Sequence, residues 1–112
     1  MDLNVALAHV DGDRQFLAEL ASMFLQDYPR LLQEARDSIL QGDHKTLERT
    51  AHTLKGRLAF FGVQKGREKV IALELLGRSN DLSNAAQMLA EVEAEMAGIL
   101  VEFEALLQDP NA

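Results

Sequence analysis

Residues 82–106 read LSNAAQMLAEVEAEMAGILVEFEAL, and this stretch indicates the class of fold. Its apolar side chains recur at alternating spacings of three and four, at Leu82, Ala85, Leu89, Val92, Met96, Ile99, Phe103 and Leu106. Such spacing places them on one side of an α-helix, where a neighbouring helix can bury them. Asp109 and Pro110 end the pattern. We therefore expect one long amphipathic helix from Leu82 to this point.

Three earlier segments show the same helical spacing and are separated by short polar turns. The first, about 14–40, follows a capping sequence at residues 11–13 and contains Pro29, which predicts a kink or two helices near Tyr28. The second runs from about 44 to 61 and the third from about 64 to 78. Their apolar positions are Phe16, Leu20, Phe24, Leu31, Leu32, Ala35 and Ile39, then Leu47, Ala51, Leu54, Leu58 and Phe61, then Val63, Val70, Ile71, Leu73, Leu75 and Leu76.

Four amphipathic helices joined by short connections predict antiparallel neighbours. We expect an all-α fold, an antiparallel up-and-down four-helix bundle with a short extra N-terminal helix at about residues 3–9. A chain of 112 residues suits one domain spanning 1–112. The seven-residue repeat of the last helix also permits a coiled-coil dimer, but wide apolar stripes on several helices favour intramolecular packing and a monomer.

Composition excludes several classes of function. The chain has no cysteine, which excludes thiol chemistry and disulfides and is typical of the cytoplasm. We expect no membrane contact, because no apolar run approaches a membrane span and the N-terminus lacks signal-peptide features. The net charge of −7 argues against nucleic-acid binding. Residues 45–78 nevertheless hold eight basic and three acidic side chains, a local basic field on an acidic protein.

His52 lies on the second long segment, opposite its apolar positions. At about 100° per residue, those positions fall between about 100° and 220° from His52, so the imidazole is expected to face solvent. Exposed histidines are largely neutral at physiological pH, and neutral imidazole is a nucleophile. The residues expected to share its face, within about 60° of it, are Lys45, Glu48, Lys55, Gly56 and Ala59.

Two neighbours of His52 need an explanation. Gly56 costs a helix interior about 1 kcal/mol relative to alanine. With Ala59 it leaves a shallow recess that would let a partner approach the imidazole, unless the glycine only admits a neighbouring helix. Lys55, one turn from His52, could offset the charge of a phosphoryl group on the ring, although a lone surface lysine can equally be solvated.

Residues 51–56, AHTLKG, followed by FGV at 61–63, resemble the signature of histidine-containing phosphotransfer domains, in which His-x-Leu-Lys-Gly is followed six residues later by Gly. The resemblance covers nearly the whole chain. It includes a Phe-rich helix with a proline at 24–29, a Gly-Asp turn at 42–43, a Leu-Glu pair at 73–74 and an Asp-Leu turn at 81–82.

This resemblance implies that His52 is the phosphoacceptor, that Lys55 steadies the phosphoryl group and that Gly56 clears space for a partner. The implied partners are response-regulator receiver domains or a histidine kinase core, and the implied role is that of a carrier without turnover of its own, not an enzyme. Magnesium would belong to the receiver, so no cofactor is expected here. The expected docking face comprises Lys45, Glu48, Arg49 and Phe60, whose basic side chains would attract an acidic pocket.

The sequence departs from the family pattern after Gly56, where Arg57, Leu58 and Phe60 replace small residues. Phe60 is expected to be covered by the helix at 64–78 or to be an exposed docking residue. His9 and His44 lack partners at metal spacing, so no metal site is expected. The alternative function is a helical adaptor that binds through the His52 face without phosphorylation. Whether the chain is free-standing or part of a hybrid sensor kinase stays open.

Overall fold

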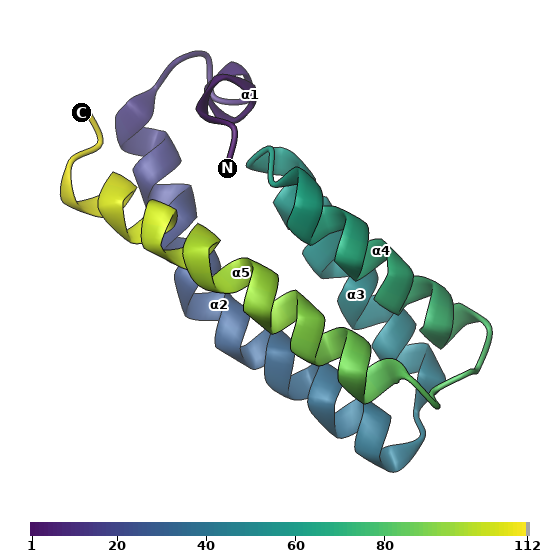
Figure 1. The fold of residues 1–112 in the computed structure, drawn as a ribbon. Helices are drawn as coiled ribbons and strands as arrows, with labels where there is room; N and C mark the ends of the chain where they lie inside the picture. The colour runs from purple at the N-terminus through teal and green to yellow at the C-terminus, as the bar shows by residue number, and fades with distance from the viewer. Residues whose placement is uncertain (112) are drawn as a thin grey trace.

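The computed structural model describes residues 1–111, and within that range it contains helices and no strand. The helices are α1 (Leu3–Ala8), α2 (Arg14–Gln41), α3 (His44–Phe60), α4 (Gln64–Arg78) and α5 (Ala85–Gln108). The four long helices form an elongated bundle of 44 × 20 × 18 Å (Figure 1). Each packs against its neighbour in sequence, and α5 closes the ring against α2. The all-α up-and-down bundle with a short N-terminal helix is therefore confirmed.

The core is formed by the apolar stripes that the spacing predicts. All five stripe positions of α3 and its end, 47, 51, 54, 58 and 61, are buried. Three aromatic rings meet at one end of this core: Phe61 lies 4.7 Å from Phe103 and 5.8 Å from Phe24, measured between ring centroids. Such contacts stabilise the core beyond the burial of their area. None of the helices in residues 1–111 is long and apolar enough to cross a membrane.

Of the two alternatives predicted near Tyr28, a kink or two helices, the second is wrong, because α2 continues through Pro29 as one helix of 28 residues. The proline removes one backbone hydrogen bond from the helix interior. Buried side chains lie on both sides of it, among them Phe24 and Leu31. Packing against the bundle therefore holds the helix together across the position that local propensity disfavours.

Two other expectations are corrected by the structure. α5 begins at Ala85 rather than at Leu82, because the chain turns at residues 83–84 before the helix. Asp81 accepts hydrogen bonds there from the amide and hydroxyl of Ser83. Phe16 and Leu75, placed on apolar stripes by their spacing, are exposed. Spacing identifies an apolar stripe, but it does not say whether another helix covers that stripe.

The turn between α2 and α3 fixes where α3 starts. Gly42 ends α2 in the left-handed conformation, with φ at 69°, which glycine adopts without strain. The Asp43 carboxylate then accepts hydrogen bonds from the Thr46 amide at 3.1 Å and the Thr46 hydroxyl at 2.6 Å. These bonds lower the pKa of Asp43. The cap sets His44 as the first helical residue and so sets the face on which His52 lies.

α3 and α4 approach each other closely at Gly77. A Cβ atom on Gly77 would lie 2.7 Å from the backbone nitrogen of Glu48, so a side chain there requires the two helices to separate. Gly98 on α5 is the contrasting case, since a Cβ atom there would meet nothing within 4 Å.

We expect Gly77→Ala to lower the free energy of unfolding by about 1–2 kcal/mol, because the backbone clash outweighs the gain in helix propensity. Gly98→Ala should raise it by up to about 1 kcal/mol. Urea denaturation followed by circular dichroism measures both values. Equal effects of the two substitutions would contradict the close approach at Gly77.

Candidate functional site

His52 stands on the exposed side of α3. Its side chain is 68% exposed, whereas the flanking residues Ala51 and Leu54 face the core and are buried. The prediction that the imidazole faces solvent is therefore confirmed. The ring is accessible to another molecule without any rearrangement of the bundle.

A buried carboxylate lies beneath the imidazole. Oε2 of Glu74 on α4 is 2.7 Å from Nδ1 of His52, and the Glu74 side chain is only 4% exposed. The two residues belong to different helices, so the contact exists because α3 and α4 pack side by side. A hydrogen bond to a charged partner is stronger than one between neutral groups, and its strength increases away from water.

Two cations also contact this carboxylate. Nζ of Lys55 donates to Oε1 at 2.8 Å, and an Arg78 guanidinium nitrogen lies 3.8 Å from Oε2. Arg78 is itself held by Glu48, whose Oε2 accepts from Nε at 2.9 Å. Burial alone would raise the pKa of Glu74, but the hydrogen bonds and charges of Lys55 and His52 outweigh it, so the pKa lies below its usual value.

The state of Glu74 decides which nitrogen of His52 is free. An ionised carboxylate can only accept hydrogen bonds, so Nδ1, at 2.7 Å, must carry the proton. In the neutral ring, Nε2 then has the unshared electron pair. The geometry presents a nucleophilic nitrogen to solvent, with a negative charge behind the ring that compensates positive charge developing on it.

The recess beside His52 is open. A Cβ atom added to Gly56 would meet nothing within 4 Å, and both Gly56 and Ala59 are exposed. The alternative that Gly56 admits a neighbouring helix is therefore wrong; Gly77 is the glycine that does this. Clearance for a partner remains the role predicted for Gly56 and Ala59.

The four residues predicted as a docking face lie in different surroundings. Lys45 and Arg49 are exposed and make no ion pair within residues 1–111, whereas Glu48 is half-buried against Arg78. Phe60 is half-buried, and the residue that stacks on its ring is His9 at the end of α1, with centroids 4.7 Å apart. The sequence predicted that Phe60 is either covered by the helix at 64–78 or an exposed docking residue. It did not identify the contact with His9.

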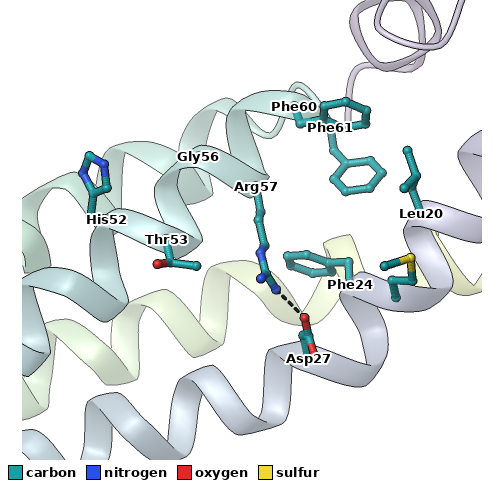
Figure 2. Close-up of a pocket in the computed structure, with 10 residues that line it drawn as sticks. Leu20, Phe24, Asp27, His52, Thr53, Gly56, Arg57, Phe60 and Phe61 are labelled. Carbon is teal, nitrogen blue, oxygen red and sulfur yellow. Dashed lines mark hydrogen bonds and ion pairs between the residues drawn. The ribbon is translucent and has the colours of Figure 1, made fainter.

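A groove of about 550 Å³ runs from His52 along the α2 side of α3 (Figure 2). Its residues on α2 are Leu20, Met23, Phe24 and Asp27, and those on α3 and its end are His52, Thr53, Gly56, Arg57, Phe60 and Phe61. Within it Arg57 donates to Asp27 at 2.7 Å, joining the two helices. The groove is mostly apolar, and His52 lies at one end of it with its imidazole directed away from Arg57 and Asp27 (Figure 2).

Sequence reasoning did not assign Glu74 and Arg78 to the site. One signal was available: Glu74 occupies the buried side of α4, between Val70 and Gly77, where a charge is costly unless it is paired. Residues 1–111 contain no group of three or more acidic or histidine side chains arranged to hold a metal ion.

Comparison with protein families assigns the chain to a class. The Hpt domain family matches residues 19–107, which is most of the chain, so the chain belongs to the Hpt domain family. This is the class of helical domains that carry phosphoryl groups on histidine in two-component phosphorelays.

A solved structure shares the fold. It is the crystal structure of histidine-containing phosphotransfer protein B from Pseudomonas aeruginosa PAO1, with a TM-score of 0.88 and 23% sequence identity. The match covers 96% of this chain and 94% of the other. The search of curated proteins found no match.

The lowered pKa of Glu74 predicts a specific pH dependence of stability. The ionised carboxylate stabilises the folded state above the ordinary glutamate value, about pH 4.3, and this contribution is lost as the pH falls through the lower folded-state pKa. We expect Glu74→Gln to lack this acid-dependent part of the free energy of unfolding. Urea denaturation between about pH 7 and pH 3 measures it.

The exposed Glu104 provides the matched control, because Glu104→Gln should keep the pH dependence of the wild type. Parallel curves for Glu74→Gln and the wild type would show that the buried carboxylate is not stabilised in its ionised form.

Proposed function

We propose that this chain is a cytoplasmic phosphotransfer carrier that accepts a phosphoryl group on Nε2 of His52 and passes it to a receiver-domain aspartate. The donor is one of two kinds of protein. It is either a receiver, which carries an aspartyl phosphate, or a histidine kinase core. The observation that carries the proposal is an exposed imidazole whose Nδ1 is hydrogen-bonded to the buried carboxylate of Glu74. Membership in the Hpt domain family supports the same activity.

In transfer from a receiver, the Nε2 lone pair attacks phosphorus in line with the aspartyl oxygen. The N–P bond forms as the P–O bond breaks, and the aspartate carboxylate leaves with the electron pair. Nδ1 keeps its proton throughout, so the phosphorylated ring is cationic and Glu74 compensates its charge. The same steps in reverse, with a second receiver, pass the phosphoryl group from Nε2 to the aspartate of that receiver. Glu74 acts here as a positioning residue.

Lys55 is suited to stabilise the phosphoryl group. Its ammonium has three donors, one of which contacts Glu74, and the others can reach an anion on the same helix face. Gly56 and Ala59 leave room for the partner, and the exposed cations Lys45 and Arg49 would attract the acidic pocket of a receiver. The receiver would contribute magnesium, so the carrier needs no cofactor of its own. We propose that it acts as a monomer without turnover.

The chain's three histidines allow a direct test. Incubation with a receiver domain carrying a labelled aspartyl phosphate should transfer an acid-labile, base-stable label to the wild type. His52→Ala should abolish the label, because it removes the nucleophile. His9→Ala and His44→Ala are the matched controls and should still be labelled.

Label that persists in His52→Ala would contradict the assignment of the phosphoacceptor. A wild type that binds the receiver but acquires no label would instead favour the alternative of a non-phosphorylated adaptor, which uses the same face for binding alone.

Gly56→Arg should slow transfer from the receiver at least tenfold, because its side chain would project into the open recess beside His52. The control is Gly98→Arg, which adds the same side chain at an exposed position on α5 and should leave the rate unchanged. Rapid-quench kinetics measure transfer, and circular dichroism checks that both variants remain helical. An unchanged rate for Gly56→Arg would contradict the clearance role.

A further inference from the structure

The N-terminal segment is tied to the end of α3. The Asp2 amide donates to the Phe61 carbonyl at 3.1 Å, and Nδ1 of His9 is 3.0 Å from the Phe60 carbonyl. The N-terminal ammonium also pairs with Glu102 on α5 at 2.9 Å. α1 lies outside residues 19–107, the part that matches the Hpt domain family. These contacts therefore join residues that precede the matched part to residues within it.

His9 holds Phe60 in two ways. Its ring stacks on the Phe60 ring with centroids 4.7 Å apart and planes at 21°, and its Nδ1 donates to the backbone of the same residue. The opposite contact of Phe60 is edge-on to Phe61, at 5.1 Å. Phe60 is thus fixed between α1 and the core. Because Phe60 also lines the groove, α1 fixes the end of the groove distant from His52 (Figure 2).

The opposite side of the groove offers uncovered apolar surface. Leu20 and Met23 line the groove from α2, and Phe16 lies one helical turn before Leu20, outside the groove lining. Phe16 and Met23 are 45% and 59% exposed. The charges within the groove, on Arg57 and Asp27, neutralise each other. A surface of this kind is suited to apolar side chains of a partner rather than to an ion.

The position of His52 identifies the occupant. His52 lies at one end of the same groove, so the groove is adjacent to a protein that brings an aspartyl phosphate to Nε2. The exposed cations Lys45 and Arg49 lie on the N-terminal side of His52 and complement an acidic pocket. A receiver domain whose acidic pocket is bordered by an apolar patch satisfies both regions together.

We propose that His9 and Phe60 form a specificity determinant for receiver docking. Phe60 contacts the apolar patch of the receiver, and His9 is a positioning residue that holds the ring in place from α1. This inference rests on the proposed carrier function. It assigns α1 a role in partner recognition and none in the chemistry at His52.

The experiment separates docking from chemistry. Receiver domains from the organism that encodes this chain are purified and phosphorylated with labelled acetyl phosphate, and the acetyl phosphate is then removed. The receiver that transfers its label fastest to the wild type is used for the measurements. The transfer rate as a function of receiver concentration gives a half-saturating concentration and a maximum rate. Phosphoramidate, a small donor that needs no docking surface, reports the reactivity of His52 alone.

His9→Ala should raise the half-saturating concentration by roughly two- to tenfold, the range expected for loss of one aromatic contact. The maximum rate and labelling by phosphoramidate should stay unchanged. Phe60→Leu should act in the same direction, and the double variant should show less than the product of the two single effects. His44→Ala is the matched control, because its Nδ1 contacts the Gly77 carbonyl at 3.1 Å, away from the groove, and should change nothing.

Unchanged half-saturation in both His9→Ala and Phe60→Leu would overturn the inference. An equal effect of His44→Ala, or a parallel loss of phosphoramidate labelling, would also overturn it by showing a general effect on the fold or on His52. A wild type that neither donor labels would refute the carrier function itself, and the docking inference with it. If both donors label the wild type and neither His9→Ala nor Phe60→Leu changes half-saturation, only the docking inference is refuted.

Discussion

The hydrogen bond between Nδ1 of His52 and the buried Glu74 carboxylate is the interaction on which the site depends. It gives an otherwise ordinary surface histidine a fixed ring orientation and a defined protonated nitrogen. A charge buried to this extent is costly unless it is paired, and here Lys55 and Arg78 approach the same carboxylate. The proposed nucleophile is therefore exposed, while the group that orients it is protected from water.

The bundle maintains this arrangement through a few local features. Gly42 and the Asp43 cap fix the start of α3, and Gly77 allows α4 to approach closely enough for Glu74 to reach the imidazole. Gly56 contributes the opposite property, an empty space on the outer face of the same helix. Close packing on one side of α3 and open space on the other are both consequences of where glycine occurs.

Much of this structure could be predicted from local pattern. Spacings of three and four gave the helices and the buried stripe of α3, and so the solvent-facing position of His52, because side-chain direction in a helix repeats every 3.6 residues. Spacing could mark Glu74 as a charge on the buried side of α4, but it could not pair Glu74 with His52. Glu74 is 22 residues from His52, and their contact depends on the rotation and separation of two helices. The stacking of His9 on Phe60 could not be predicted either, because the two residues are 51 positions apart and meet only through the packing of the end of α1 against the end of α3. Continuity of α2 through Pro29 likewise reflects tertiary packing rather than local preference.

Nitrogen NMR of the His52 ring tests the central claim most directly. In protein labelled with nitrogen-15, long-range couplings to the ring protons distinguish the two neutral tautomers and identify the nitrogen that bonds to phosphorus after treatment with phosphoramidate. We predict that neutral His52 carries its proton on Nδ1, that this preference weakens in Glu74→Ala, and that phosphorus is attached to Nε2. A ring protonated mainly on Nε2, or a phosphoryl group on Nδ1, would contradict the role assigned to Glu74.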